Sequence, residues 1–177
     1  MAEGLYRTVR LKLTLPDSWP KEESGPLRLR AALPHGASLE AALSLGAPLD
    51  PERWSQEAVL GTVPPDAEAI FIAPGLSERE TRSGWPFVLL LAELRELTEP
   101  EPEPESGSGP VEAGQGALLG YHLGAFYVFL AYAAEVHVRC PDRAAYQALE
   151  AALRKVLVSA TVEWPDGAGA SLATLCS

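Results

Sequence analysis

The chain begins with two segments in which hydrophobic and polar residues alternate, residues 8–15 and residues 27–33. A period of two residues is typical of a strand with one buried face. We expect the two strands to pair antiparallel. Their polar sides would then bring four basic residues together: Arg10, Lys12, Arg28 and Arg30. Like charges across a strand pair repel, so this face would need an acidic cover from the chain, a second copy or a partner.

Helix signals appear at three places. Ser38 as N-cap and Gly46 after the last turn predict a short helix over Leu39–Leu45. Asp50 followed by proline predicts a second helix that ends near Leu60. A last helix follows Pro141-Asp142, where hydrophobic residues recur at helical spacing: Tyr146, Leu149, Leu153 and Val156.

The remaining hydrophobic runs predict strands at 67–73, 86–97, 117–123 and 125–140, with Gly124 as a turn or bulge between the last two. Residues 159–164 are expected to form a final short strand or an extended tail. The pattern therefore predicts an α+β sandwich: a mostly antiparallel, twisted sheet of about six strands flanked by helices.

A proline- and glutamate-rich segment at 98–116 interrupts this pattern, with Glu and Pro alternating from Glu99 to Glu105. It has almost no hydrophobic surface to bury, so we expect a flexible acidic surface loop. The residues after it are too few to form a core alone, so we expect one domain over 1–177. The tail at 165–177 is expected to be loose.

The net charge is −10, and five of the acids lie in the 98–116 segment. An acidic chain argues against nucleic acid and against anionic membranes as partners, because both need clustered basic residues. The N-terminus has no uninterrupted hydrophobic run typical of a signal peptide. With two cysteines, Cys140 and Cys176, a disulfide framework is not expected. We therefore expect a reduced, cytoplasmic protein, and the excess of Arg over Lys (11 to 3) is typical of a GC-rich bacterial genome.

Motifs for catalysis or cofactor binding are absent from the sequence. There is no G-x-S-x-G and no phosphate-binding glycine loop, and His35, His122 and His137 do not share metal-ligand spacing. One row of polar residues alternates along a predicted strand: Glu135, His137 and Arg139. It fits an acid–base or ligand-binding row, or a solvated sheet face, and we favour the solvated face. We expect no enzyme, no cofactor and no metal.

Tryptophans adjoin turns at Trp19, Trp85 and Trp164, where such a side chain either covers the core or forms an interface. The candidate partner-binding residues are therefore the four basic residues and two tryptophans: Arg10, Lys12, Arg28, Arg30, Trp19 and Trp85.

The order of elements resembles the PsbP-like family. The first strand ends in a Pro-x-x-Trp turn, Leu15-Pro16-Asp17-Ser18-Trp19, and the last helix ends in Val156-Leu157-Val158-Ser159. The family includes the Eag-type chaperones that escort effectors of bacterial type VI secretion. The resemblance implies an antiparallel sheet flanked by helices and binding rather than catalysis, and no catalytic residue carries over.

We therefore predict a non-catalytic intracellular protein-binding module, such as an adaptor, a secretion chaperone or an immunity-type partner. Two alternatives remain. One is a ligand-binding or enzymatic domain with a pocket under the sheet, lined by Tyr121, Tyr127 and Tyr132 with Glu135 and His137 at its mouth. The other is a structural homo-oligomer, for example a homodimer.

Overall fold

The computed structural model describes residues 9–23, 28–98 and 116–163. Its main sheet has seven strands, all of them antiparallel to their neighbours. In spatial order they are β2 (Lys21–Glu23), β3 (Arg28–Ala32), β4 (Ser38–Leu45), β8 (Tyr132–Cys140), β7 (Leu118–Phe129), β6 (Phe87–Glu96) and β5 (Ala67–Ile72). Strands β1 (Arg10–Lys12) and β9 (Thr161–Glu163) form a separate pair.

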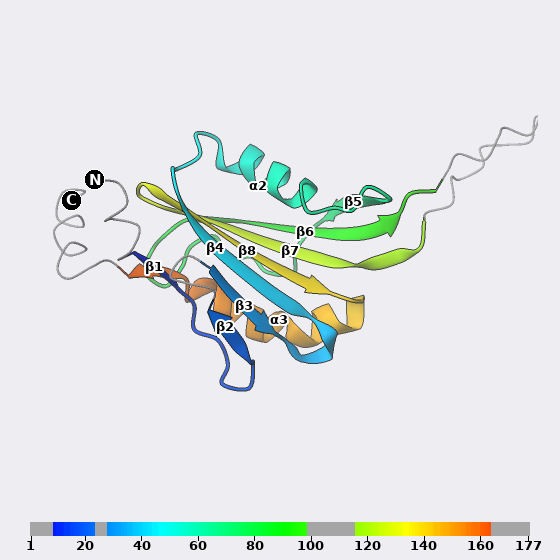
Figure 1. Cartoon of the computed structure of the whole chain (residues 1–177), viewed down its shortest axis with the longest axis horizontal. Helices are drawn as coiled ribbons and strands as arrows, with labels where there is room; N and C mark the ends of the chain where they lie inside the picture. The colour runs from blue at the N-terminus through cyan, green and yellow to red at the C-terminus, as the bar shows by residue number, and fades with distance from the viewer. Residues whose placement is uncertain (1–8, 24–27, 99–115, 164–177) are drawn as a thin grey trace, which may run out of the picture.

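Two helices flank the sheet, α2 (Pro51–Leu60) and α3 (Arg143–Val158), and a short 3-10 turn, η1 (Pro34–Gly36), joins β3 to β4 (Figure 1). Both helix starts agree with the sequence signals: Asp50 accepts a hydrogen bond from the Arg53 amide and Asp142 from the Ala145 amide. The expected α+β fold with an antiparallel sheet is confirmed.

Helix α3 covers one face of the sheet and encloses the main core. Its inner side carries six buried residues: Ala145, Tyr146, Leu149, Leu153, Val156 and Leu157. They pack with the inward residues of β4, β8 and β7, among them Leu39, Val136 and Tyr127. The Tyr127 hydroxyl donates a 2.8 Å hydrogen bond to the Leu157 carbonyl and so joins the centre of the sheet to the end of the helix.

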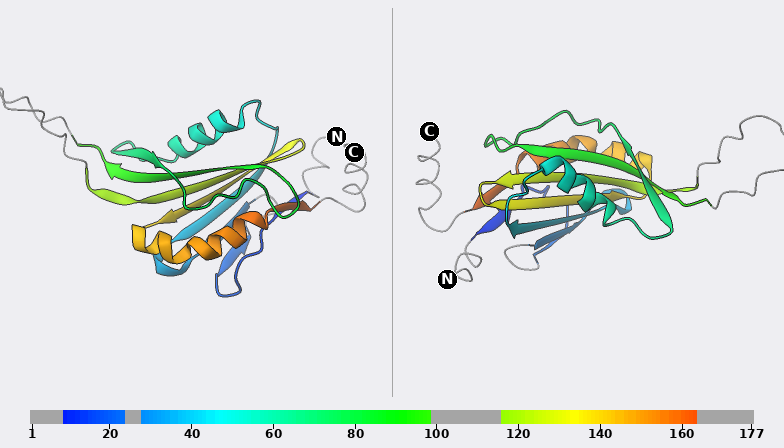
Figure 2. Two further views of the ribbon diagram at one scale, coloured as in Figure 1. Left: turned by 180° about the vertical axis from the view of Figure 1, so that it is seen from behind. Right: turned by 90° about the horizontal axis from the view of Figure 1, so that it is seen from above.

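Helix α2 covers part of the opposite face, where it packs on β6 and β7 (Figures 1 and 2). Val59 is fully buried against Ala92 and Phe126, and the Trp54 ring meets the Phe126 ring edge-on with centroids 5.3 Å apart. This smaller core holds the helix on only two of the seven strands. Among the described elements, no helix lies over the same face of β3, β4 and β8.

That uncovered part of the sheet, called the open face below, consists of the outward residues of β3, β4 and β8. They include Arg28, Arg30, Glu40, Ala42, Glu135, His137 and Arg139, all half-buried or exposed. The open face is continuous with the surface under α2, because His122, Gly124 and Phe126 of β7 lie opposite Arg139, His137 and Glu135 of β8.

Two sequence predictions about the first strands are wrong. Residues 39–45 form strand β4 rather than a helix, because Leu39, Ala41 and Leu43 alternate into the core. Gly46 has φ 111° and serves the turn after this strand. Strand β1 pairs with β9 and not with β3, so Arg10 and Lys12 do not lie beside the arginines of β3.

The predicted break at Gly124 is also wrong. Strand β7 continues through this residue, and the chain turns instead at residues 130–131, between β7 and β8. Gly124 is required for space: a Cβ there would lie 2.6 Å from the Phe126 ring and 3.1 Å from Val59. The glycine therefore lets Phe126 and α2 approach the sheet.

Several expectations concern residues outside the described ranges. They include almost all of the acidic segment at 98–116, the tail at 165–177, and the residues Trp164 and Cys176. Cys140 is buried and has a free thiol. Within the described ranges, none of the helices combines the length and the hydrophobicity needed to cross a membrane.

We expect Gly124→Ala to lower the free energy of unfolding by about 1–3 kcal/mol, because the new methyl group must displace the Phe126 ring or α2. Urea unfolding followed by tryptophan fluorescence measures this change, and Trp54 reports directly on the α2 contact. Unchanged stability would contradict the close approach of α2 to β7.

Candidate functional site

A shallow groove of about 180 Å³ lies on the open face. Its floor is the small side chain of Ala42, because Arg28, Ala42 and Glu135 face one another in a row across β3, β4 and β8. The next row holds Arg30, Glu40 and His137. The groove is therefore lined by arginines on its β3 side and by an acid and a histidine on its β8 side.

The charged side chains at the groove form weak, exposed ion pairs. Glu40 lies 3.2 Å from Arg30 and 3.9 Å from Arg139, and all three side chains are more than 40% exposed. Pairs of this kind contribute about 0–1 kcal/mol, so a partner can replace them at small cost. Arg28 has no ion-pair partner among the described residues.

A line of hydrogen bonds leads from the groove into the protein. The His137 Nε2 lies 3.1 Å from Glu135 Oε2, and the His137 Nδ1 lies 2.9 Å from His122 Nε2. The His122 Nδ1 lies 3.1 Å from the hydroxyl of Thr62, just after α2. We call these four residues, Thr62, His122, His137 and Glu135, the histidine network.

His122 is the buried centre of this network, with no exposed surface. Burial lowers its pKa to about 3, and the nearby charges of His137 and Arg139 contribute in the same direction. His122 is therefore neutral near pH 7 and carries a hydrogen on one ring nitrogen only. Its two hydrogen bonds satisfy both nitrogens, which explains how an imidazole is accommodated at full burial.

Thr62, His122 and His137 are arranged like a nucleophilic hydroxyl, its general base and the residue that orients the base. A general base works best with a pKa near the operating pH, and the low pKa of His122 makes it a weak one. The groove also opens at Glu135 and His137, not at Thr62. No cluster of three or more potential metal ligands occurs among the described residues.

The predicted partner-binding residues fall in three places. Arg28 and Arg30 line the groove. Arg10 and Lys12 lie on β1, in the separate two-stranded sheet. Trp19 is buried in the main core, and Trp85 packs edge-on against Phe129 with ring centroids 5.4 Å apart. The acidic cover sought for Arg30 is Glu40, from the chain itself.

The sequence placed the polar row of Glu135, His137 and Arg139 on one strand face, as observed, but did not connect it with His122. The signal is the register: a turn at 130–131 places His122 diagonally from His137 on the same face. Predicting a break at Gly124 hid this relation.

The pocket expected under the sheet does not form as predicted. Tyr121, Tyr127 and Tyr132 are buried on the α3 side, whereas Glu135 and His137 lie on the opposite face. The Tyr121 hydroxyl donates to Glu93 at 2.9 Å, and the Tyr121 ring stacks on Tyr146. The tyrosines are structural neighbours of α3 and not part of the groove.

Comparison with known proteins gives a likeness of fold. No protein-family model matches the sequence, and no curated protein matches it significantly. The solution structure of cyanobacterial PsbP (CyanoP) from Synechocystis sp. PCC 6803 is similar, with TM-score 0.49 and 12% sequence identity over 88% of this chain and 93% of that chain. Nothing about function follows from a likeness of this size, and nothing in it concerns Eag-type chaperones.

The low pKa of His122 predicts a pH dependence of stability. Between about pH 6.5 and about pH 3, unfolded His122 binds a proton that the folded protein does not, so the free energy of unfolding falls as the pH falls. The effect is at most about 1.4 kcal/mol per pH unit, and it fades above pH 6.5, the ordinary pKa that the unfolded histidine has. His122→Gln should remove this part of the slope in urea unfolding.

The matched control is His35→Asn, which changes an exposed histidine in η1 at a residue with φ 61° that asparagine tolerates. The control should keep the slope of the parent protein. Parallel stability curves for His122→Gln and the parent would show that His122 is not held neutral by burial.

Proposed function

We propose that this protein is a non-catalytic protein-binding module that works inside the cell and binds its partner at the groove on the open face. The observation that carries the proposal is the groove itself: a part of the sheet that no described helix covers, with exposed, weakly paired charges around a small floor residue. Interfaces commonly combine such polar surroundings with a contact surface that is already formed.

The geometry favours an extended partner segment over a helix. The groove runs across β3, β4 and β8, and it is shallow, with Ala42 as its floor. Its charged residues offer hydrogen bonds and ion pairs to side chains of a bound segment, whereas a helix needs a hydrophobic groove for its apolar side. An adaptor, a secretion chaperone and an immunity-type partner would each fit this description.

The histidine network supports binding over catalysis. The only hydroxyl beside a histidine in it belongs to Thr62, and this hydroxyl donates to the Val59 carbonyl at 2.7 Å. Its neighbour His122 has a pKa too low for an effective base near pH 7. We therefore assign the network to the structure and charge of the groove.

The test is affinity capture from the cell of origin with three forms of the full chain. Ala42→Tyr fills the floor of the groove, and Ala148→Tyr places the same side chain on the exposed side of α3 as a control. We expect the parent and Ala148→Tyr to retain the same protein. Its affinity for Ala42→Tyr should fall about tenfold or more, which is a loss of about 1.4 kcal/mol or more.

Two results would contradict the proposal. Equal retention by Ala42→Tyr would place the binding surface elsewhere, and no retention above background by any form would argue against a binding module. Recovery of untagged copies of the chain itself, lost in Ala42→Tyr, would identify the groove as a homodimer interface.

A further inference from the structure

The histidine network links the groove to a buried group through hydrogen bonds whose direction depends on one proton. Four contacts lie in series: Val59 O to Thr62 Oγ1, Thr62 Oγ1 to His122, His122 to His137, and His137 to Glu135. Each hydrogen bond needs one hydrogen atom between its two heavy atoms. The number of hydrogens that the residues carry therefore decides which contacts can form.

With all four contacts formed, the hydrogens have one arrangement. The Thr62 hydroxyl donates to the Val59 carbonyl, so the Nδ1–H of His122 must donate to Thr62. Neutral His122 then has a bare Nε2, which accepts from the Nδ1–H of His137. The contact between His137 and Glu135 needs one more proton, on either residue. In this state the two histidines and Glu135 together have no net charge.

Loss of that proton does not break the network, because the hydrogen bonds can reverse. The Thr62 hydroxyl then donates to His122 Nδ1, the Nε2–H of His122 donates to His137 Nδ1, and the Nε2–H of His137 donates to Glu135. Only the Val59 carbonyl loses a donor, and it keeps the Thr62 amide at 3.0 Å. The reversed network carries one negative charge, at Glu135 on the groove.

The charges around the network determine how this proton affects the binding of a charged partner. Three arginines, Arg28 and Arg30 on β3 and Arg139 on β8, face two acids, Glu40 on β4 and Glu22, which lies opposite Arg30 on β2. Counted over the described residues, the groove therefore has one surplus positive charge when the network holds its proton, and none when the proton is lost. An acidic group in the groove favours the protonated state.

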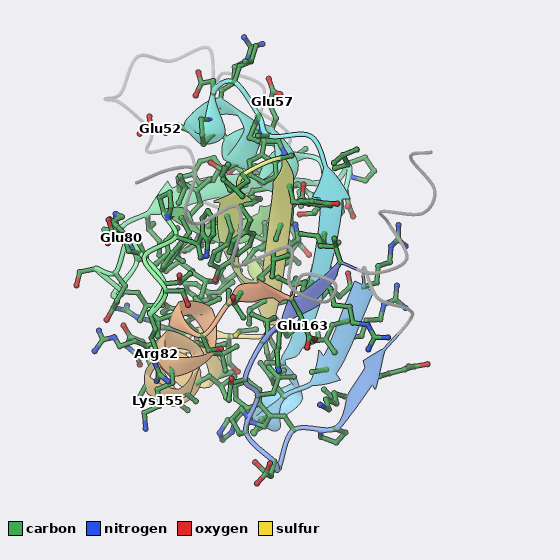
Figure 3. All side chains as sticks on the ribbon, turned by 90° about the vertical axis from the view of Figure 1, so that its left-hand side faces the viewer. Glu52, Glu57, Glu80, Arg82, Lys155 and Glu163 are labelled. Atoms are coloured by element: carbon green, nitrogen blue, oxygen red, sulfur yellow. The ribbon has the colours of Figure 1, made fainter. Side chains whose placement is uncertain are left out.

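Helix α2 adds little charge to this balance. It turns Val59 toward the sheet, and its Arg53 and Glu57 pair with each other at the surface, 2.8 Å apart. Figure 3 shows Glu52 and Glu57 on the outer side of α2. The neighbours of the network on β6 and β7 are apolar: Ala92 lies opposite His122, and the Phe126 ring meets the His137 ring edge-on at 5.5 Å.

We infer that the groove binds an acidic segment of a partner protein together with one proton, and that loss of this proton reverses the hydrogen bonds of the histidine network. The inference rests on the proposed function for its partner and on the geometry of the network for its proton. Binding and protonation are reciprocal, so each strengthens the other by the same factor. With one proton taken up, affinity changes by up to about tenfold per pH unit.

The first measurement is the tautomer of His122, from the ¹⁵N NMR shifts of its ring in the full chain between about pH 5 and about pH 8. The inference predicts the hydrogen on Nδ1 at the acid end and on Nε2 at the alkaline end. Glu135→Gln should weaken or remove this change, because a glutamine amide can donate to a bare His137 Nε2, so the arrangement with the hydrogen on His122 Nδ1 forms without the extra proton. Glu52→Gln, on the outer side of α2, should leave the change as it is in the parent protein.

The second measurement adds a glutamate–glycine repeat peptide and, as its control, the glutamine–glycine peptide of equal length. The acidic peptide should shift the signals of the groove residues and raise the midpoint of the tautomer change, and the neutral peptide should do neither. Arg28→Glu should abolish the effect. Lys155→Glu, on α3 (Figure 3), should preserve it.

The outcomes separate the inference from the proposed function. One unchanged tautomer of His122 over the whole pH range would overturn the inference, even if the groove binds a protein. A tautomer change without binding of the acidic peptide would overturn the acidic partner and leave the reversal supported. A tautomer change with equal partner capture by Ala42→Tyr would contradict the proposed function and, with it, the acidic partner in the groove, and would leave only the reversal of the network supported.

Discussion

The structure depends most on the pairing of β7 with β8. These two long strands form the centre of the sheet, in a register that runs from Tyr121 opposite Cys140 to Phe129 opposite Tyr132. Because side chains alternate between faces, this register sends Tyr127 and Val136 toward α3 and sends His122, Gly124 and His137 to the other side. A slip of one residue would reverse every one of these side chains.

The open face follows from the size of the second helix. A helix with its side chains is about 10 Å across, and neighbouring strands are about 4.8 Å apart, so one helix covers about two strands. Helix α2 covers β6 and β7, where Gly124 gives Phe126 the space to pack under it. On that side of the sheet, the outward residues of β3, β4 and β8 are mostly polar, and they form the groove. The histidine network lies at the boundary between the two regions, with Thr62 beside α2 and Glu135 beside the groove.

Local signals in the sequence predicted much of the fold. The caps at Asp50 and Asp142 located both helices, alternation located β3, and a hydrophobic run located β6. The errors arose where a local signal had two physical meanings. Ser38 and Gly46 look like helix caps but bound a strand, because the alternation of Leu39, Ala41 and Leu43 into the core outweighs them.

The candidate site was harder to predict, because it depends on contacts between distant strands. The turn at Leu130 and Ala131 contains no typical turn residue, and Leu130 takes φ 54°, which side chains rarely adopt. Without that turn, the register of β7 on β8 and the meeting of His122 with His137 could not be derived. The ion pair of Arg30 with Glu40 could be predicted only by placing β4 as a strand beside β3. The sequence did identify Arg28, Arg30 and the row from Glu135 to Arg139, because each lies on one strand.

Interstrand nuclear Overhauser effects in the isotope-labelled full chain measure the register of β7 on β8. We expect cross-strand backbone contacts between Gly124 and His137 and between Phe126 and Glu135. Contacts displaced by one residue, with Gly124 opposite Val136 or Val138, would contradict it. They would place His122 and His137 on opposite faces of the sheet and remove both the groove and the network.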